Sequence, residues 1–346
     1  MNGSGTRSGE PNTKNLIFTI FVHFAKDLKK VSVICLCYNQ APYLQEALES
    51  VWNQTYPDIQ VIVVDDASTD NSGEVIKSLL KGKPDIPFIE NIENQGNCSS
   101  FNSAMKLAAG DYIIDFSLDD VMHPDRVAAQ VSFFETLDES FGVIYHNAEY
   151  INENGNFLKH HFSASFSQPE ADIYKRLIST YFIAPPTMMF RKQVIDDLGG
   201  YDARLSYEDF DFWVRSARKY KYAYQPEALT SIRKHSSSLS TGWYKKGDKQ
   251  LYSTYLVCLK IQQMNRSAEE DQALIRRLRY EIRQSVFSAN HKEATLFLDL
   301  LKGYGRLPLI YLILEPLNRS KIDLRWLRNS YHWLQGHLFA PKSHFK

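Results

Sequence analysis

Two kinds of hydrophobic pattern alternate along residues 31–136. Short, mostly apolar runs, most of them rich in β-branched residues, predict buried strands. They are Val31–Leu36, Gln60–Val64, Phe88–Ile92 and Tyr112–Phe116. After each run, apolar residues recur three or four positions apart, which predicts an amphipathic helix, the last being Pro124–Thr136. Alternation of strands and helices indicates a parallel sheet covered by helices.

The pattern is less regular further along the chain. We expect strands at Gly142–Asn147, Ala184–Phe190 and Thr230–His235, and helices at Lys192–Leu198 and around Trp213. After Trp243, helical spacing dominates in Leu251–Met264 and Ala268–Ala289, and the apolar run Leu307–Leu314 is closed by Pro316. These changes predict an N-terminal extension (1–30), an α/β domain (31–243) and a helical C-terminal region (244–346).

Composition narrows the class of protein. Lys+Arg and Asp+Glu are equal at 40 each, so the overall charge does not point to nucleic acid. The four cysteines lack metal-type spacing, which favours a reducing, cytoplasmic setting. No apolar run approaches the roughly 18–20 residues that span a bilayer, and Leu16–Phe24 lacks the cleavage site of a secretory signal.

Polar residues follow three of the predicted strands: Tyr38-Asn39, Asp65-Asp66 and the segment Ser117–Asp120. Because the carboxyl ends of parallel strands share one edge of a sheet, these side chains can converge on one ligand. Carboxylates at that edge could hold a divalent cation against phosphate, or could simply form polar turns. No Gly-x-Gly-x-x-Gly motif and no phosphate-loop motif is present. We therefore expect a nucleotide bound through its base and ribose, with its phosphates held through metal.

Four motifs occur in a characteristic order: VSVICLCYNQAPYLQEALESVWNQTY, VIVVDDASTDNS, NQGNCSSFNSAMKLAAGDYIIDFSLDD and GGYDARLSYEDFDFWVR. From about Val31 to Ser240 the chain resembles the family-2 glycosyltransferases of the GT-A fold. The resemblance implies a Rossmann-like mixed sheet, mostly parallel, flanked by helices and followed by a helical extension. It also implies inverting transfer of a sugar from a nucleotide-diphosphate donor to an acceptor hydroxyl.

The resemblance assigns a donor-nucleotide role to Tyr38, Asn39, Asp65, Asp66, Asn94, Gly96, Ser117 and Arg233. Asp66 would accept from the base ring N–H, and Asp65 would lie beside the nucleoside. Asp119 matches the last Asp of the family's metal motif, and His235 would reach the Mn²⁺ or Mg²⁺ or the pyrophosphate. The chain departs from the motif at Ser117, which stands where the first Asp usually lies and brings no charge.

The resemblance places the catalytic base at Asp209. Inverting transfer needs one carboxylate to take the proton of the acceptor hydroxyl. Acids in the first turn of a helix also complement its dipole, and Glu208 or Asp211 could do only that. We assign Asp120, Glu208 and Trp213 to secondary or acceptor-side positions.

The partners expected from the resemblance are a UDP-sugar and a glycan or lipid-linked acceptor, as in cell-surface polysaccharide synthesis. Between Lys302 and Lys346, basic residues mix with aromatic ones. This mixture suits contact with the inner face of the membrane, and a helical lid packed on the catalytic domain fits equally well. A regulator that binds nucleotide-sugar without turnover is the alternative function, and nucleic acid is not an expected partner.

Overall fold

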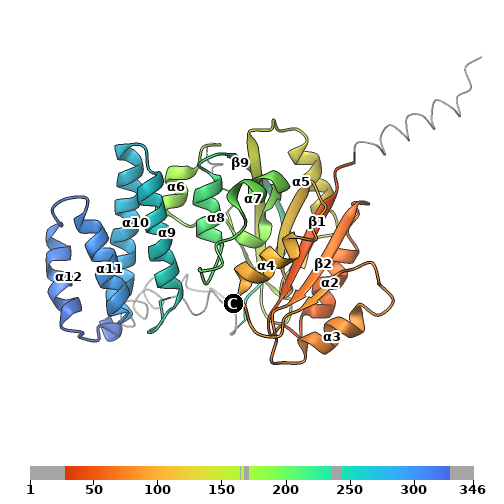
Figure 1. The fold of residues 1–346 in the computed structure, drawn as a ribbon, viewed down its shortest axis with the longest axis horizontal. Helices are drawn as coiled ribbons and strands as arrows, with labels where there is room; N and C mark the ends of the chain where they lie inside the picture. The colour runs from red at the N-terminus through yellow and green to blue at the C-terminus, as the bar shows by residue number, and fades with distance from the viewer. Residues whose placement is uncertain (1–27, 164, 167–170, 236–243, 328–346) are drawn as a thin grey trace, which may run out of the picture.

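A mixed nine-stranded sheet forms the centre of the described residues, which are 28–163, 165–166, 171–235 and 244–327 of the computed structural model (Figure 1). The strands are β1 (Val31–Cys37), β2 (Ile59–Asp65), β3 (Phe88–Glu90), β4 (Tyr112–Ser117), β5 (Val121–Met122), β6 (Phe141–Ile151), β7 (Phe157–His160), β8 (Met189–Arg191) and β9 (Lys221–Arg233). Their order is β3-β2-β1-β4-β8-β6-β9-β5, with β7 paired to β6.

The sheet has a parallel half and a half of mixed direction. Strands β3, β2, β1 and β4 pair in parallel, as the alternating pattern predicts. Beyond β4, only β6 and β9 pair in parallel, while β8, β5 and β7 pair antiparallel to their neighbours. Four of the eight pairings among the described residues are thus parallel, and the parallel pairs are concentrated in the half of the sheet that the alternating pattern predicts.

Helices cover both faces of the parallel half (Figure 1). The first helices along the chain are α2 (Leu44–Trp52), α3 (Ser72–Leu79), α4 (Asn97–Met105) and α5 (Arg126–Phe134). All seven residues of β1 are buried, and successive side chains enter opposite cores because strand side chains alternate in direction. Val33 and Cys35 pack in one core with Leu48, whereas Ile34 packs in the other with Phe101.

Helices α6 (Tyr174–Ser179), α7 (Lys192–Leu198), α8 (Asp209–Ser216), α9 (Gln250–Met264), α10 (Ala268–Phe287), α11 (His291–Lys302) and α12 (Leu309–Arg319) follow. Helix α9 contacts α8, and α10 contacts α6. The buried residues of α9 and α10 join the same core as Ile34. Helix α12 lies at the end of the array away from the sheet (Figure 1). No helix among the described residues is long and apolar enough to cross a membrane.

One expectation that involves proline was wrong. Ala184–Phe190 is not one strand, because Pro185–Thr187 forms a 3₁₀ turn and β8 begins only at Met189. Two consecutive prolines lack the N–H groups that a strand ladder needs. Pro316, which ends the apolar run Leu307–Leu314, lies inside α12, and the helix continues to Arg319. The N-terminal extension to residue 27 and the aromatic residues after 327 lie outside the described residues.

Candidate active site

The loops after β1 and β2 are tied together at the carboxyl edge of the sheet. Asn39 adopts a left-handed φ of 56°, and its side-chain oxygen accepts from the backbone N–H groups of Thr69 (2.7 Å) and Asp70 (3.2 Å). Its own N–H donates to Ser68 Oγ at 2.9 Å, and Ser68 in turn donates to Asp65. The predicted donor residue Tyr38 is nearly half exposed beside this junction.

A cavity of about 450 Å³ opens at the ends of β2 and β3. It is lined by Asp65, Ala67, Ser68, Thr69, Glu90, Asn91 and Ile92. This volume falls in the range of small-molecule pockets, although the lining is more polar than in most of them, since only Ala67 and Ile92 are apolar. The cavity lies at the edge where the sequence predicts the nucleoside.

Asp65 and Asp66 differ in what their side chains contact. Asp65 lines the cavity, whereas the carboxylate of Asp66 accepts from Asn91 Nδ2 (2.8 Å) and from the N–H groups of Gln95 and Gly96 (both 2.9 Å). Asn94 Nδ2 donates to the backbone oxygen of Asp66 at 3.2 Å. Asp66 therefore anchors the segment that carries Asn94 and Gly96, and Asp65 is the acid that faces the cavity.

The end of β4 brings the two predicted metal ligands together. His235 Nε2 lies 2.8 Å from Asp119 Oδ2, although 116 positions separate them in the chain. Ser117 Oγ, on the same strand end, accepts from Gln40 Nε2 at 2.9 Å. No third His, Cys, Asp or Glu joins a metal-binding group within the part of the chain that the structure describes.

This ligand set fits a divalent ion that also binds phosphate. Mg²⁺ and similar ions in such sites take one or two protein ligands and complete their shell with phosphate oxygens and water. A carboxylate oxygen and an imidazole nitrogen are both ligands of Mn²⁺. Asp119 and His235 would hold the ion in this protein.

Arg233 and Asp120 have structural contacts. The buried guanidinium of Arg233 donates to Asp119 O (2.9 Å), to the backbone oxygens of Asn152 and Glu153, and to Glu46 Oε2 (2.5 Å). Asp120 Oδ1 accepts from the backbone N–H of Arg233 at 2.8 Å, and burial raises the pKa of its carboxyl. These contacts join β9 to the end of β4, and they do not support the predicted role of Arg233 in donor binding.

The predicted base lies at the start of α8. Glu208 precedes the helix and Asp209 is its first residue. Burial raises the pKa of Asp209 well above its usual range, and the negative charges of Glu208 and Asp115 raise it further. Among the described residues, Asp209 Oδ1 is buried and has no hydrogen-bond partner. A carboxylate with a raised pKa is suited to accept a proton near neutral pH.

Asp115 belongs to this acidic cluster, and the sequence analysis missed it. It lies on β4, two residues before Ser117, and accepts from the hydroxyl of Tyr201 at 3.1 Å. Burial and the charge of Glu208 raise the pKa of its carboxyl. Asp115 is the only acid in the apolar run Tyr112–Phe116, which is the signal that could have identified it.

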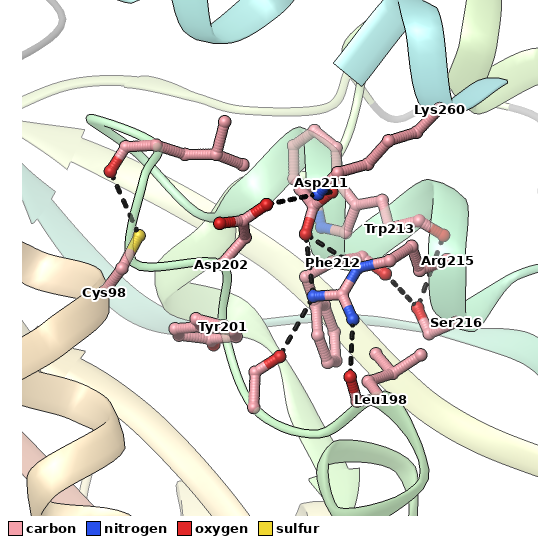
Figure 2. Close-up of polar contacts among 12 residues, drawn as sticks. Cys98, Leu198, Tyr201, Asp202, Asp211, Phe212, Trp213, Arg215, Ser216 and Lys260 are labelled. Carbon is pink, nitrogen blue, oxygen red and sulfur yellow. Dashed lines mark hydrogen bonds and ion pairs between the residues drawn. The ribbon is translucent and has the colours of Figure 1, made fainter. Parts of the chain in front are cut away.

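The neighbouring predicted positions are structural. Asp211 is 1% exposed and contacts Arg215 Nε at 2.7 Å and Lys260 Nζ at 2.5 Å (Figure 2). Trp213 is buried, and its indole N–H donates to Met188 Sδ at 3.1 Å. The contacts of Asp211 set it apart from Asp209, while those of Trp213 give no support to an acceptor-side role.

Comparison with known proteins identifies the family. Residues 32–199 match the model of glycosyl transferase family 2. The glycosyltransferase MJ1057 of Methanocaldococcus jannaschii is 32% identical over 235 residues, which cover 66% of this chain and 78% of that protein. The chain belongs to glycosyltransferase family 2. Two further relatives of this glycosyltransferase are matched over only 36% and 52% of their own length.

Solved structures share the fold of the glycosyltransferase. S. aureus TarS 1–349 in complex with UDP-GlcNAc superposes with a TM-score of 0.63 at 20% identity, over 88% of this chain and 92% of that one. The mannosyltransferase PcManGT from Pyrobaculum calidifontis, in complex with GDP-Man and Mn²⁺, gives 0.55 at 18% identity, over 94% and 92%. Both likenesses extend beyond residue 243, so the helical region is part of the shared architecture.

Proposed function

We propose that this glycosyltransferase transfers a sugar, with inversion, from a nucleotide-diphosphate donor to a hydroxyl of a glycan or lipid-linked acceptor. The complexes of the structural neighbours contain UDP-GlcNAc and GDP-Man, and a UDP-sugar is the donor we expect here. The acceptor class corresponds to polysaccharide synthesis at the cell envelope. The observation that carries the proposal is the contact between Asp119 and His235 at the edge that also holds the nucleoside-sized cavity.

On the donor side, the chain supplies a pocket and a place for metal. The nucleoside would occupy the cavity beside Asp65, and Tyr38 and Asn39 would border it. A divalent ion between Asp119 and His235 would neutralise charge on the diphosphate when bound. Ser117 would contribute a neutral hydroxyl, which can contact ribose or a metal-bound water.

On the acceptor side, Asp209 would take the proton of the attacking hydroxyl. The acceptor oxygen forms a bond to the anomeric carbon as the bond from that carbon to the diphosphate oxygen breaks. Attack from the face opposite the leaving group inverts the anomeric centre. The proton moves to the Asp209 carboxylate, and the bonding electrons leave with the nucleoside diphosphate. The raised pKa of Asp209 supports this role.

The test of the donor site is Asp119→Ala. We expect thermal-shift stabilisation by UDP or GDP with Mn²⁺ to be lost, because the diphosphate then lacks the ion that offsets its charge. Asp111→Asn is the matched control, since Asp111 precedes the opposite end of the same strand. Equal donor affinity in Asp119→Ala and the native protein, with and without chelator, would contradict the metal role.

A turnover assay on the same variants, which measures release of nucleoside diphosphate, separates an enzyme from a regulator, the alternative that the uncharged Ser117 raises. A regulator binds the donor but releases no nucleoside diphosphate in the presence of metal and acceptor. Release that depends on Asp119 would exclude the regulator.

We also propose that α12 contacts the inner face of the cell membrane. Leu309, Ile310, Leu312 and Ile313 are 53–74% exposed, and residues 307–314 include no charged side chain. Exposed basic residues lie near both ends of α12: Arg306 precedes the helix, Arg319 is its last residue and also pairs with Glu315, and Lys321 follows it. An apolar surface with a basic rim is complementary to an anionic bilayer, whereas a second copy would present the same positive charge.

A further inference from the structure

Helix α9 holds the segment that contains the predicted base. Ser206 donates its N–H to Ser253 Oγ at 2.9 Å, and the Tyr207 hydroxyl lies 2.7 Å from Thr254 Oγ1. Both contacts come immediately before Glu208 and Asp209 in the sequence. The base-bearing segment, residues 206–211, is therefore fixed at its start by two neighbouring residues of α9.

The other side of the segment is fixed by Lys260. Its ammonium group donates to Asp211 Oδ1 (2.5 Å) and to Asp202 Oδ2 (2.7 Å), as Figure 2 shows. Ser253 and Lys260 are seven residues apart, so they lie on nearly the same face of α9. One face of α9 thus contacts residues on both sides of Asp209.

Lys260 is not the only cationic partner of Asp211. Asp211 is almost completely buried, and a buried carboxylate needs a cation or several donors to offset its lost hydration. Arg215, one turn along α8, is its second partner at 2.7 Å (Figure 2). Loss of Lys260 would leave Asp211 paired with Arg215, while the ion pair between α8 and α9 would be gone and their apolar packing would remain.

We propose that Lys260 is a positioning residue for the base, holding the start of α8 so that Asp209 faces the acceptor hydroxyl. The inference rests on the proposed role of Asp209. Proton transfer requires the two oxygens to approach within hydrogen-bond distance, and displacements of about 1 Å can cost about 10²-fold in rate. Through Lys260, the helical region would then contribute to transfer without contacting the substrates.

The test compares Lys260→Met with Arg218→Met in the full chain. Arg218 makes a two-pronged ion pair with Glu270 (2.9 and 2.7 Å), which also joins the α8 region to the helical region. Arg218 lies just after the C-terminal end of α8, whereas Asp209 is at its N-terminal end. We expect Lys260→Met to lower kcat by about 10–10²-fold, with donor KM and UDP affinity unchanged. Arg218→Met should lower Tm and leave kcat near the native value. Lys260→Arg should recover most of kcat, because a guanidinium can bond both carboxylates.

Three outcomes would overturn the inference. Native kcat in Lys260→Met would show that the contact does not position the base. Equal losses in both variants, in proportion to the unfolded fraction, would indicate a general structural role. Asp209→Asn, measured alongside, distinguishes failure of the proposed base from failure of the positioning role. Full transfer in that variant refutes the proposed base and the inference with it. An inactive Asp209→Asn beside a fully active Lys260→Met refutes only the positioning role.

Discussion

The donor side and the base side of this glycosyltransferase are held in place in different ways. The donor side consists of loops that follow β1, β2 and β4, and these loops contact one another directly, as Asn39 contacts Thr69. The base side depends on α9, whose residues follow their partners by 47 to 58 positions. The sheet therefore assembles the nucleotide pocket, whereas the base also requires the packing of the C-terminal helices.

The acids on the two sides also differ in what their carboxyl groups contact. Asp66 is saturated by three donors, two of them backbone N–H groups, so its carboxylate is used to fix a loop. Asp209 is partly buried next to Glu208 and Asp115, with its Oδ1 atom buried, and its pKa is raised by burial and by their charge. Burial beside like charges favours the protonated form of a carboxyl group. This environment suits Asp209 to proton transfer near neutral pH.

The largest expected effect is that of Asp209→Asn. The change keeps the shape of the side chain and removes the proton acceptor, so transfer should fall by about 10²–10⁴-fold. Donor affinity should be nearly unchanged, because the base acts on the acceptor. In the native protein, transfer should rise with pH through the raised pKa of Asp209, since only the carboxylate accepts a proton. Initial rates across pH and UDP affinity for both proteins provide the measurement.

Glu208→Gln and Asp211→Asn are the controls for this comparison. Asp211→Asn weakens the pairs with Arg215 and Lys260, so it should cost mainly stability. Glu208→Gln removes a charge that raises the pKa of Asp209 and should move the acid limb of the rate profile to lower pH. If Asp209→Asn keeps near-native transfer while one of these loses it, the base is the neighbouring carboxylate.

A smaller effect should distinguish the two acids of the donor side. Asp65→Asn should weaken UDP binding by about tenfold or more, the value of one hydrogen bond to a charged group, because Asp65 lines the cavity. Asp66→Asn should lower the free energy of unfolding by about 1–3 kcal/mol, because an amide N–H₂ then faces backbone donors. Calorimetric titration with UDP and denaturant unfolding measure the two effects. A stable Asp66→Asn that no longer binds UDP would favour the base contact implied by the family resemblance.

The sequence predicts the donor side better than the base side for a physical reason. Apolar runs followed by Tyr38-Asn39, Asp65-Asp66 and Asp119 identify strand ends, and parallel strands necessarily bring those ends together. The family resemblance, with its motifs in order, then pairs Asp119 with His235. Neither pattern nor motif indicates that Lys260 contacts Asp211, because that contact depends on how α9 packs on α8. Asp115 is visible as an acid in an apolar run, but its neighbours Tyr201 and Glu208 come from another part of the chain.

The smallest expected effect concerns α12. Within the helical region, α12 and α9 differ in what their faces contact. Helix α9 faces the base-bearing segment, while α12 presents an apolar face that no described segment covers. Ile313 is 54% exposed, and Ile313→Ser should weaken binding to anionic vesicles by about fivefold, the equivalent of about 1 kcal/mol of apolar burial. Leu158→Ser is the matched control, because Leu158 on β7 is exposed to a similar degree, at 51%.

Flotation with anionic and neutral vesicles at low and high salt distinguishes the possible occupants of this face. Membrane contact predicts co-flotation that weakens with salt, because each Lys or Arg near an anionic surface contributes about 1 kcal/mol. Transfer to a water-soluble acceptor should be native in Ile313→Ser, since α12 lies away from Asp209. Absence of co-flotation at low salt, or equal co-flotation of both variants, would contradict membrane contact. A concentration-dependent dimer that Ile313→Ser abolishes would instead assign the face to a second copy, and the helical region would then pair two active sites.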